Sequence, residues 1–512
     1  MGAITAVSRL LGFGRVLVVA AVLGTTYLGN AFQAANSFSN VLFELLAAGA
    51  LSAVLVPVFV ELLDRDDQAG AEQVAGGVLG LALLGLGVVT VVGVVAAPLV
   101  ARLLTPGVPD ATAAEQRELI AHLLRFFVPQ VLLYAAGAVA TAVLYARRRF
   151  AVTALAPIGN TVVTIASLLA LRAVADGPLG LDVAGGERWL LVVAGSGGVV
   201  AFVGILLVAC ERSGFRLRPR LPRGDARVWS AVRRSGWGVV LHTGAGVLQG
   251  AAVIGGAAVA GGVVAYQIGW VFFLAPYAVL AQPIHTAILP ELVVEAGEPP
   301  VFASSVRWSL ERMALLVLPV AAGLLALAGP GMRLVSFGES GEAGADLLRA
   351  ALCGLAVGLF PYGAFLLLAR AFYALGDSRF PGLVALGSSA GGALVVAVGA
   401  PMTDGSARVV LLGAAHSAAY AVGALVLGVT LARRLGSRVR PVAAGRMAMV
   451  SIAAGLVSWR VAEALSGTDP SRASDLVALV AAGAVGTLGV LGGYRATAVG
   501  PALTVRLPRV AP

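Results

Sequence analysis

The stretch "ATAVLYARRRFAVTALAPIGN" (140–160) decides the fold of this chain, because a similar stretch occurs a second time. The second copy reads "LLARAFYALGDSRFPGLVALGSS" (367–389). Tyr145 aligns with Tyr373, and the Arg-Phe pair that follows each tyrosine aligns at nearly the same spacing. In both copies two apolar runs flank a short polar turn, which is typical of a hairpin of two membrane-spanning helices.

A second pair of motifs repeats at a similar distance along the chain. "LSAVLVPVFVEL" (51–62) matches "IHTAILPELVVE" (284–295), with Pro57 aligned to Pro290. Two independent pairs predict two homologous six-helix lobes, 1–210 and 235–434, related by a pseudo-twofold axis. Six is an even number, so both copies enter the membrane in the same direction. Parallel repeats of this kind place a substrate path between the lobes.

Composition assigns the chain to the membrane. Of its 512 residues 59% are hydrophobic and only 12% are charged, whereas an average soluble domain has about 25% charged residues. The predicted class is therefore an all-α polytopic membrane protein. Fourteen apolar runs are long enough to span a bilayer: 3–25, 31–63, 74–104, 119–146, 150–174, 189–210, 235–259, 263–292, 306–329, 346–375, 380–401, 408–432, 447–465 and 474–494.

Two groups of these fourteen runs differ from the rest, by their length or by their position outside the repeat. The runs 31–63 and 74–104 exceed the ~20 residues that a bilayer needs, so we expect them to tilt or to extend beyond it. The last two runs lie outside the duplication and predict two extra C-terminal helices within 435–494.

Arginine predicts the orientation, because positively charged loops stay in the cytoplasm. With the N-terminus inside, the Arg-rich turn 146–150, a basic linker at 211–234, the loop 433–446 and the tail 495–512 all lie in the cytoplasm. Both termini are then cytoplasmic in a multi-pass plasma-membrane protein. The net charge of +10 reflects these loops, and their dispersion between spans argues against nucleic acid as a partner.

Catalytic, metal and cofactor motifs are missing from the sequence. The four histidines, His122, His242, His285 and His416, fall in four different spans without metal-ligand spacing. There is no nucleophile elbow and no phosphate-binding loop. We therefore expect a transporter rather than an enzyme, with no cofactor, no metal and no ATP-driven step.

Polar side chains gather at the start of the second run, "NAFQAANSFSNVLFELLAAGALS" (30–52). Gln33, Asn36, Asn40 and Glu44 recur every three or four residues, so they share one face of a helix, and Asn30 precedes them. Such a stripe faces either another helix, which it holds by hydrogen bonds, or a water-filled cavity. The sequence leaves both readings open for the amides, but a carboxylate at Glu44 needs a cation or a proton.

Two arginines in the first run need separate explanations. Arg9 lies close enough to the cytoplasmic end to extend its guanidinium to the interface as an anchor, although it also suits an anion site. Arg15 lies ~18 Å into the span, too deep for easy anchoring. It either pairs with Glu44 or binds an anionic substrate, for which its planar guanidinium suits phosphate oxygens. In the second lobe, Gln267 is a further candidate for substrate binding.

These motifs resemble the MurJ (MviN) family of lipid II flippases, which is related to MATE exporters and polysaccharide flippases. "SRLLGFGRVLVVAAVLG" (8–24), "FFLAPYAVLAQPIHTAILPEL" (272–292) and "RAFYALGDSRFPGLV" (370–384) carry the resemblance together with the polar stripe. It implies fourteen spans, a cationic central cavity and an undecaprenyl-pyrophosphate-linked peptidoglycan precursor as the substrate. It further implies alternating access, a lipid-tail groove at the C-terminal helices, and substrate-binding roles for Arg9 and Arg15.

The chain also departs from the family pattern. Asn30 falls where many members have an aspartate. Phe43 and Glu44 fall where members have a pair of arginines, and Val271 falls near a further arginine of the family. The cavity is therefore less cationic than the resemblance implies. The leading hypothesis is flipping of lipid II for cell wall synthesis, with contact to the wall-synthesis machinery. The alternatives are transport of another polyprenyl-linked glycan or amphiphile, and a scaffold that does not transport. The energy source and oligomeric state are not determined by the sequence.

Overall fold

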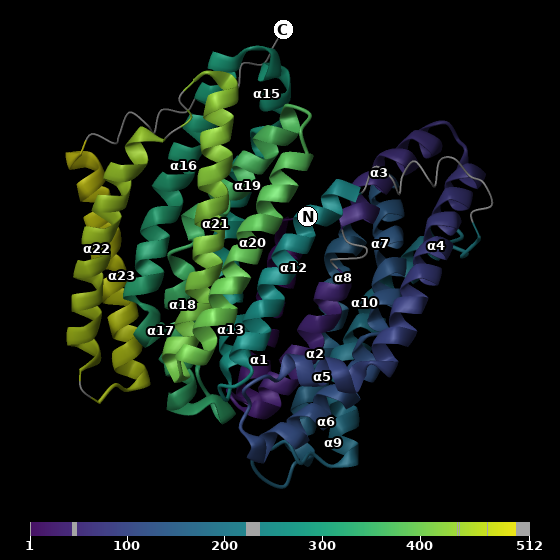
Figure 1. Cartoon of the computed structure of the whole chain (residues 1–512), viewed down its shortest axis with the longest axis horizontal. Coiled ribbons are helices and arrows are strands. Elements are labelled where there is room, and N and C mark those ends of the chain that lie inside the picture. Colours follow the sequence, from purple (N-terminus) through teal and green to yellow (C-terminus); the bar gives the residue numbers. More distant parts are fainter. Residues whose placement is uncertain are drawn as a thin grey trace. The chain divides into compact units, whose positions relative to one another are not determined.

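The computed structural model describes residues 2–43, 49–221, 236–437, 439, 441–467 and 469–497. Within these ranges every regular element is a helix, which confirms the all-α class. The chain divides into two compact units (Figure 1). The predicted lobes, linker and tail stay predictions, and part of the linker lies outside the described residues.

Unit 1 comprises Met1–Gln267, Phe337–Gly344 and Val396–Gly405. Its helices are α1 (Gly2–Leu23), α2 (Tyr27–Phe43), α3 (Gly49–Asp64), α4 (Gln68–Val95), α5 (Ala97–Leu104), α6 (Asp110–Phe127), α7 (Gln130–Ala146), α8 (Phe150–Val174), α9 (Gly185–Val192), the π-turn η2 (Val193–Gly197), α10 (Gly198–Arg212), α12 (Gly236–Gly256), and the short turns η5 (Gly338–Ser340) and η6 (Ala400–Met402).

Unit 2 comprises Ile268–Ser336, Ala345–Val395 and Ser406–Pro512. Helices α13 (Gly262–Pro276), α18 (Gly341–Ala356), α20 (Arg379–Gly399) and α21 (Gly405–Leu435) have residues in both units. The rest of unit 2 consists of η3 (Tyr277–Ala281), α14 (Gln282–Ala287), α15 (Leu289–Val294), η4 (Glu295–Gly297), α16 (Pro299–Ala326), α17 (Ala328–Val335), α19 (Leu359–Ala374), α22 (Val442–Ser466) and α23 (Arg472–Ala496).

Ten of the described helices and helix runs are long and apolar enough to cross a membrane, and α18 with α19 makes an eleventh as a pair bent by 43°. Their outward faces are apolar: on α4, Val88, Val91 and Val95 are each more than 60% exposed. Exposed apolar faces of this kind mark surfaces that contact a membrane or another protein, and the length and hydropathy of these helices favour the membrane. The protein is therefore a multi-pass membrane protein, while the count of fourteen stays a prediction.

Prolines interrupt several of the expected runs. The run 74–104 is not one tilted helix, because α4 ends at Val95 and α5 begins at Ala97, with Pro98 in its first turn. Likewise α6 and α7 are separated at Val128 and Pro129. Proline lacks the amide hydrogen that would continue the ladder. These breaks shorten each helix to a length closer to that of the bilayer.

Two clusters of buried side chains form the core of unit 1. The first joins α1, α2, α5, α6, α8, α9 and α12, and includes Leu23, Phe127 and Leu171, which are fully buried. The second joins α3, α4, α7 and α10 around Phe59 and Val139. Leucine and valine make up most of both clusters, and alanines among them allow the helix backbones to approach closely.

The described start of the basic linker packs against α4. Phe215 is fully buried in the second cluster, and the amide of Arg220 donates to the carbonyl oxygen of Gly76 at 2.8 Å. A side chain at Gly76 or Gly80 would collide with the linker backbone. These glycines of the apolar run therefore hold an extended segment rather than a neighbouring helix.

The repeated turns have the same backbone hydrogen bonds. After α7 the amide of Arg148 donates to Tyr145 O and that of Arg149 to Leu144 O. After α19, at the equivalent positions of the second copy, the amides of Gly376 and Asp377 donate to Tyr373 O and Phe372 O. Both turns close their helix with a left-handed residue, Arg148 (φ 56°) and Gly376 (φ 79°). The sequence repeat is thus also a repeat of local structure.

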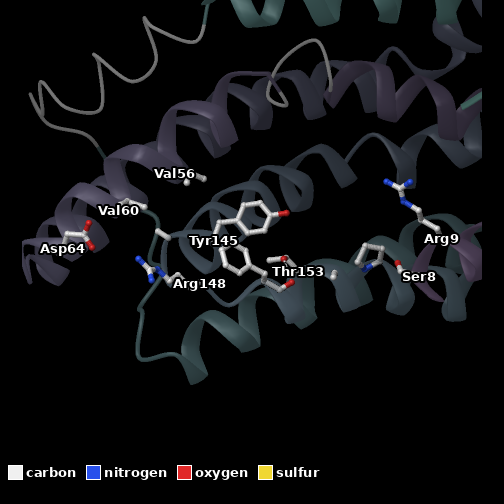
Figure 2. Close-up of a pocket in the computed structure, with 12 residues that line it drawn as sticks. Ser8, Arg9, Val56, Val60, Asp64, Tyr145, Arg148 and Thr153 are labelled. Atoms are coloured by element: carbon white, nitrogen blue, oxygen red, sulfur yellow. Dashed lines mark hydrogen bonds between the residues drawn. The ribbon is translucent and has the colours of Figure 1, made fainter. Parts of the chain in front are cut away.

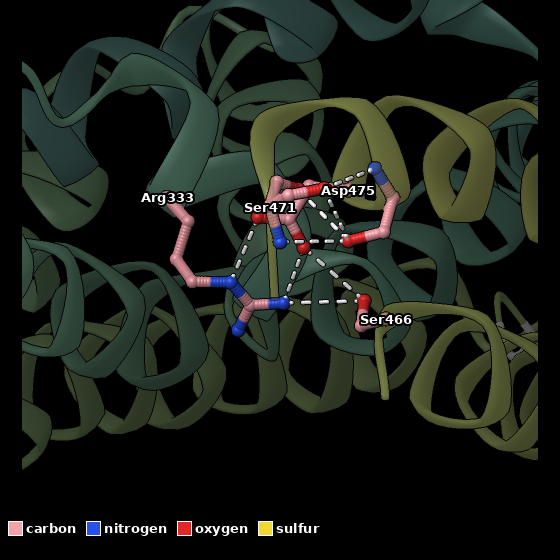
Figure 3. Close-up of polar contacts among 5 residues, drawn as sticks. Arg333, Ser466, Ser471 and Asp475 are labelled. Atoms are coloured by element: carbon pink, nitrogen blue, oxygen red, sulfur yellow. Dashed lines mark hydrogen bonds and ion pairs between the residues drawn. The ribbon is translucent and has the colours of Figure 1, made fainter. Parts of the chain in front are cut away.

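In unit 2 a buried ion pair attaches the C-terminal helix hairpin to α17 (Figure 3). The guanidinium of Arg333 donates to both carboxylate oxygens of Asp475, at 2.9 and 2.5 Å, and to Ser466 Oγ at 3.2 Å. Ser466 Oγ in turn donates to the same carboxylate at 3.1 Å. The Asp475 side chain is only 3% exposed. One arginine therefore contacts the end of α22 and the start of α23.

Replacing Asp475 by Asn should destabilise the protein by about 2 kcal/mol, because the buried side chain at this position loses its charge-assisted hydrogen bonds from Arg333. Thermal unfolding in detergent, followed by fluorescence, measures the change. The control is Glu463→Gln, which breaks an exposed pair with Arg460 and should change stability by less than about 0.5 kcal/mol. Equal effects of the two substitutions would contradict a stabilising role for the buried pair.

Candidate functional site

A polar cavity of about 210 Å³ lies inside unit 1 around Arg15. We call it the Arg15 cavity. Helix α1 contributes Arg15 and Val19, and α2 contributes Phe32 and the amide stripe. The remaining lining comes from α7, α8, η2 and α10 through Tyr134, Asn160, Thr164, Ala194, Gly195 and Val199. The spacing on α2 thus brings three predicted residues, Gln33, Asn36 and Asn40, to one cavity with Arg15.

Arg15 has no hydrogen bond or ion pair with any other residue that the structure describes. Glu44, its predicted partner, lies outside the described residues. The phenol of Tyr134 is the nearby titratable group. A permanently charged guanidinium therefore faces a small polar cavity, an arrangement that suits an anion or water.

Hydrogen bonds hold the polar wall of this cavity in place. Tyr134 Oη donates to Asn40 Oδ1 at 3.2 Å, and Thr164 Oγ1 donates to Ala194 O at 2.8 Å. Tyr134, Asn160 and Thr164 were not found from the sequence. They come from helices distant in the chain, and a lone tyrosine or threonine in an apolar run carries no pattern of its own.

The π-turn η2 shapes the side of the cavity next to Thr164. Gly195 in this turn lies against the ring of Phe127, where no Cβ would fit. The wide turn also presents the carbonyl of Ala194 to Thr164. Single π-turns inside helices are common at functional sites, and this one lines the cavity that contains the buried arginine.

Asn30 is fully buried and joins α2 to the turn between α12 and α13. Its side-chain amide donates to Val259 O at 2.7 Å, and its carbonyl oxygen accepts from the amide of Val263 at 3.0 Å. The end of α12 leaves carbonyls unpaired and the start of α13 leaves amides unpaired. An asparagine satisfies both, whereas a carboxylate could only accept. Asn30 therefore lies outside the Arg15 cavity, in a packing contact.

A second amide contact lies further along α2. Gln267 Nε2 on α13 donates to Ser37 Oγ at 2.7 Å. Gln267 does not line the Arg15 cavity. Its predicted role in substrate binding stays a prediction, and its contact in this structure is between helices.

Three turns close the end of unit 1 next to Asn30. Gly24, Gly261 and Gly338 all have positive φ. A Cβ would collide with the backbone of a neighbouring turn at Gly24 and Gly261, and with the backbone of α1 at Gly338. Ser340 Oγ donates to Ala20 O at 2.6 Å, and Thr25 Oγ1 donates to Ser340 O at 3.2 Å. Glycine at these positions permits both the left-handed backbone and the close approach.

Arg9 lies in a different cavity of unit 1, of about 920 Å³ (Figure 2). Its lining comes from the start of α1, from α3, and from the turn between α7 and α8. The two arginines of the first span thus do not share one site. The roles of Arg9 and Arg15 in substrate binding both stay predictions.

Unit 2 has an aromatic cluster that sequence reasoning missed. Trp270, Phe273, Tyr277, Tyr362 and Tyr420 pack ring against ring, with centroids 4.6–6.0 Å apart along the chain of contacts. Such aromatic pairs favour offset or edge-to-face geometry. The cluster leaves no pattern in the sequence, because its members come from four separate elements, α13, η3, α19 and α21.

Both buried histidines of unit 2 contact this cluster. His416 packs against Trp270 at 4.5 Å between centroids, and His285 Nε2 is 2.7 Å from Tyr277 Oη. Arg370 donates to His285 O and to Thr286 Oγ1, both at 3.0 Å, which makes it an anchor between α19 and α14. Among the described residues no group of histidine, cysteine or carboxylate side chains is arranged to hold a metal ion.

Comparison of folds defines the class of protein. The structure of a lipid II flippase MurJ in an inward closed conformation aligns with a TM-score of 0.76 at 17% identity, over 97% of this chain and 99% of that one. An inward-facing multidrug resistance MATE transporter aligns with a TM-score of 0.65 at 15% identity, over 84% and 98%. The chain therefore has the helical membrane-transporter fold that these proteins share.

Sequence comparison identifies the family. The model of the lipid II flippase MurJ family matches residues 19–469. The chain is 27% identical to a probable lipid II flippase MurJ of Rhizobium tropici, over 74% of this chain and 71% of the relative. It is also 27% identical to that of Haemophilus influenzae, over 76% and 78%. This chain belongs to the MurJ lipid II flippase family.

Replacing Asn30 by Ala should destabilise the protein by about 2 kcal/mol, because buried backbone groups at the α12–α13 turn lose their partners. Asn30→Asp should cost at least as much, since a buried carboxylate accepts from the α13 amides but cannot donate to Val259 O and has no cation beside it among the described residues. Thermal unfolding of the purified variants measures both. If either variant unfolded at the wild-type temperature, the contact of Asn30 with the α12–α13 turn would have no stabilising role.

Replacing Arg15 by Met should stabilise the folded protein by about 1 kcal/mol or more, because an apolar side chain of similar length removes a buried charge. The midpoint of thermal unfolding in detergent should rise. Arg65→Met removes a guanidinium that is 71% exposed and should leave the midpoint unchanged. A lower midpoint for Arg15→Met would show that Arg15 stabilises the fold.

Proposed function

We propose that this protein flips lipid II, the polyprenyl-diphosphate-linked precursor of peptidoglycan, from the inner to the outer leaflet of the plasma membrane. Membership in the MurJ family supports this substrate, and the apolar helical fold supports a route across the bilayer. The observation that carries the proposal is Arg15, a charge in a polar cavity inside the bundle without a partner among the described residues.

The free-energy cost of placing Arg15 inside the membrane supports a functional role for this residue. A guanidinium at mid-membrane costs about 3 kcal/mol even on the milder insertion scales. A diphosphate group offers the opposite charge and oxygens at the spacing of the guanidinium nitrogens. An anionic substrate bound next to Arg15 would neutralise its charge. The free-energy barrier to the conformational change of transport would then be lower with substrate bound than without it.

Alternating access gives the contact of Asn30 a role in the proposal. Asn30 belongs to the first sequence repeat, and the α12–α13 turn belongs to the second. Opening a path at this end of the protein requires these hydrogen bonds and the packed glycine turns to separate. The contact consists of a few hydrogen bonds between two short segments. It can therefore form and break as a unit, as a gate between two conformations must.

Orientation and partners complete the proposal. By the positive-inside rule the arginine-rich turns favour cytoplasmic termini, and in that orientation the glycine turns lie toward the outer leaflet. The substrate is made on the cytoplasmic side and used outside, so the flippase works between the enzymes of wall synthesis. We expect the membrane and this machinery to be its partners, without nucleic acid and without a catalytic step of its own.

A second substrate has one observation in its favour. Phe43 and Val271 stand where the family resemblance expects arginines, so fewer cations are available to a diphosphate. A polyprenyl-linked glycan with a single phosphate, or another anionic amphiphile, needs less compensating charge.

The test is replacement of the native flippase in cells depleted of their own lipid II flippase. The wild-type protein should restore growth and cell shape, Arg15→Lys should restore them partly, and Arg15→Met should fail although it inserts and folds. Expression and thermal unfolding are measured for each variant, with Arg65→Met as the control.

Two outcomes would contradict the proposal. If well-expressed wild-type protein failed to support growth, lipid II would not be the substrate. If Arg15→Met supported growth as well as wild type did, the protein would act without its buried cation, as a wall-assembly scaffold would. A direct assay of lipid II movement across vesicles then separates a transporter from a scaffold.

A further inference from the structure

The cavity around Arg9 has features that the proposed function does not use. It occupies about 920 Å³ in unit 1, within the range of small-molecule sites, and is lined by Ser8, Arg9, Val56, Val60, Asp64, Tyr145, Ala146, Arg148, Phe150, Thr153, Ala154 and Pro157. We call it the Arg148 cavity, after the left-handed residue of the turn that follows α7. In the orientation inferred from the arginine loops, this residue lies at the cytoplasmic surface.

Each end of the cavity has an arginine. Figure 2 shows Arg148 and Asp64 at one end and Arg9 with Ser8 at the other, with Tyr145 and Thr153 between them. Valine, phenylalanine and proline side chains form the rest of the wall. Cations at the ends of a partly apolar hollow fit an amphiphile with an anionic headgroup, because each part of the ligand meets a matching surface.

The backbone of Arg148 is unusual. Its φ of 56° is in the left-handed region, which is unfavourable for a residue with a long side chain. The equivalent turn of the second repeat has Gly376 with φ 79° and the same pair of backbone hydrogen bonds. Glycine adopts this conformation without strain. The first repeat therefore has a strained arginine at a position where its own duplicate has the unstrained residue.

A comparison within the chain shows that the strain at Arg148 is specific. The turn after α3 also closes with a left-handed residue that is not glycine, Asp66 with φ 55°, and its hydrogen bonds follow the same pattern. Aspartate is enriched in this conformation, whereas arginine is not. Asp66 does not line the cavity. Strained residues that the local structure does not need are concentrated at functional sites.

We propose that the Arg148 cavity is a loading site on the cytoplasmic side, where Arg148 binds the diphosphate of the lipid-linked substrate before it reaches Arg15. This inference rests on the proposed function and adds a second, earlier site to it. Arg9 lies at the end of this cavity opposite Arg148, and Arg15 lies further along the same helix, in the other cavity.

The other lining residues fit this ligand. Phosphate oxygens bind guanidinium groups in a bidentate manner, and the hydroxyls of Ser8 and Tyr145 can donate to phosphate or sugar oxygens. The hydroxyl of Thr153 already donates to Phe150 O at 2.8 Å, so it can only accept from a sugar hydroxyl. The valines and Phe150 provide an apolar wall for the first prenyl units. Asp64 opposes the ligand's charge and so competes for Arg148, which prevents the site from retaining its substrate.

The substitution Arg148→Gly gives a sharp test, because glycine removes the charge and also relieves the strained backbone. The matched control is Asp66→Gly, which introduces glycine at a left-handed turn position outside the cavity. Both variants should unfold at or above the wild-type temperature. Binding of a fluorescent polyprenyl diphosphate to protein in nanodiscs should weaken at least fivefold in Arg148→Gly and remain unchanged in Asp66→Gly. Arg148→Lys should fall between, and Asp64→Asn should bind more tightly than wild type.

Each outcome is decisive for the loading site. Equal binding and equal lipid II movement by Arg148→Gly and Asp66→Gly would overturn the inference while leaving the proposed function intact. Wild type that bound the polyprenyl diphosphate but moved no lipid II would contradict the proposed function, and the Arg148→Gly binding result would still test the site. Inorganic diphosphate should compete at least tenfold less well than the lipid-linked form; equal competition would overturn a lipid as the occupant.

Discussion

The position of one charge, the guanidinium of Arg15, determines how the rest of unit 1 is arranged. An arginine cannot lose its proton in a protein, so a helix that carries one in a membrane must face it away from lipid. Helix α1 does so by turning Arg15 toward α2, α7 and α8, and each of these helices contributes polar side chains around it. The two apolar clusters of unit 1 account for stability, while this cavity lies between helices whose other faces are apolar. Stability thus favours apolar side chains between the helices, whereas transport requires a charged and polar cavity in the same bundle.

Polar side chains outside the cavity serve mainly to join segments that are distant in the chain. Asn30 and Gln267 were grouped with the substrate-binding residues by their position in the sequence, but their contacts in this structure are with backbone and with Ser37. In a bundle without water, a hydrogen bond between helices is favourable because the unpaired alternative is costly. The same residue type can therefore hold helices together in one state of the protein and separate in another, which is what alternating access requires.

The duplication gives the chain two versions of each turn, and the differences between them are informative. The turn after α19 has Gly376 at its left-handed position, followed by Asp377, which pairs with Arg434 at 2.7 Å and accepts from the amide of Phe380 at 3.0 Å. These contacts keep the pKa of Asp377 below its usual range, chiefly through the hydrogen bond from Phe380 and also through Arg434. The turn after α7 has Arg148 and Arg149 instead. One copy is thus built for stability and the other presents cations.

The sequence alone determined the membrane class, the all-helical fold, the internal repeat and the stripe of amides on α2, because hydropathy and helical periodicity are local properties of the chain. It also singled out Arg15, since a charged residue within an apolar run can be recognised from the sequence itself. Only the tertiary structure showed that Asn30 caps a turn far away in the sequence, that Tyr134 and Thr164 complete the Arg15 cavity, and that Arg148 has a left-handed backbone. Contacts between distant segments and the sign of φ depend on how the helices pack, and neither leaves a periodic signal in the sequence.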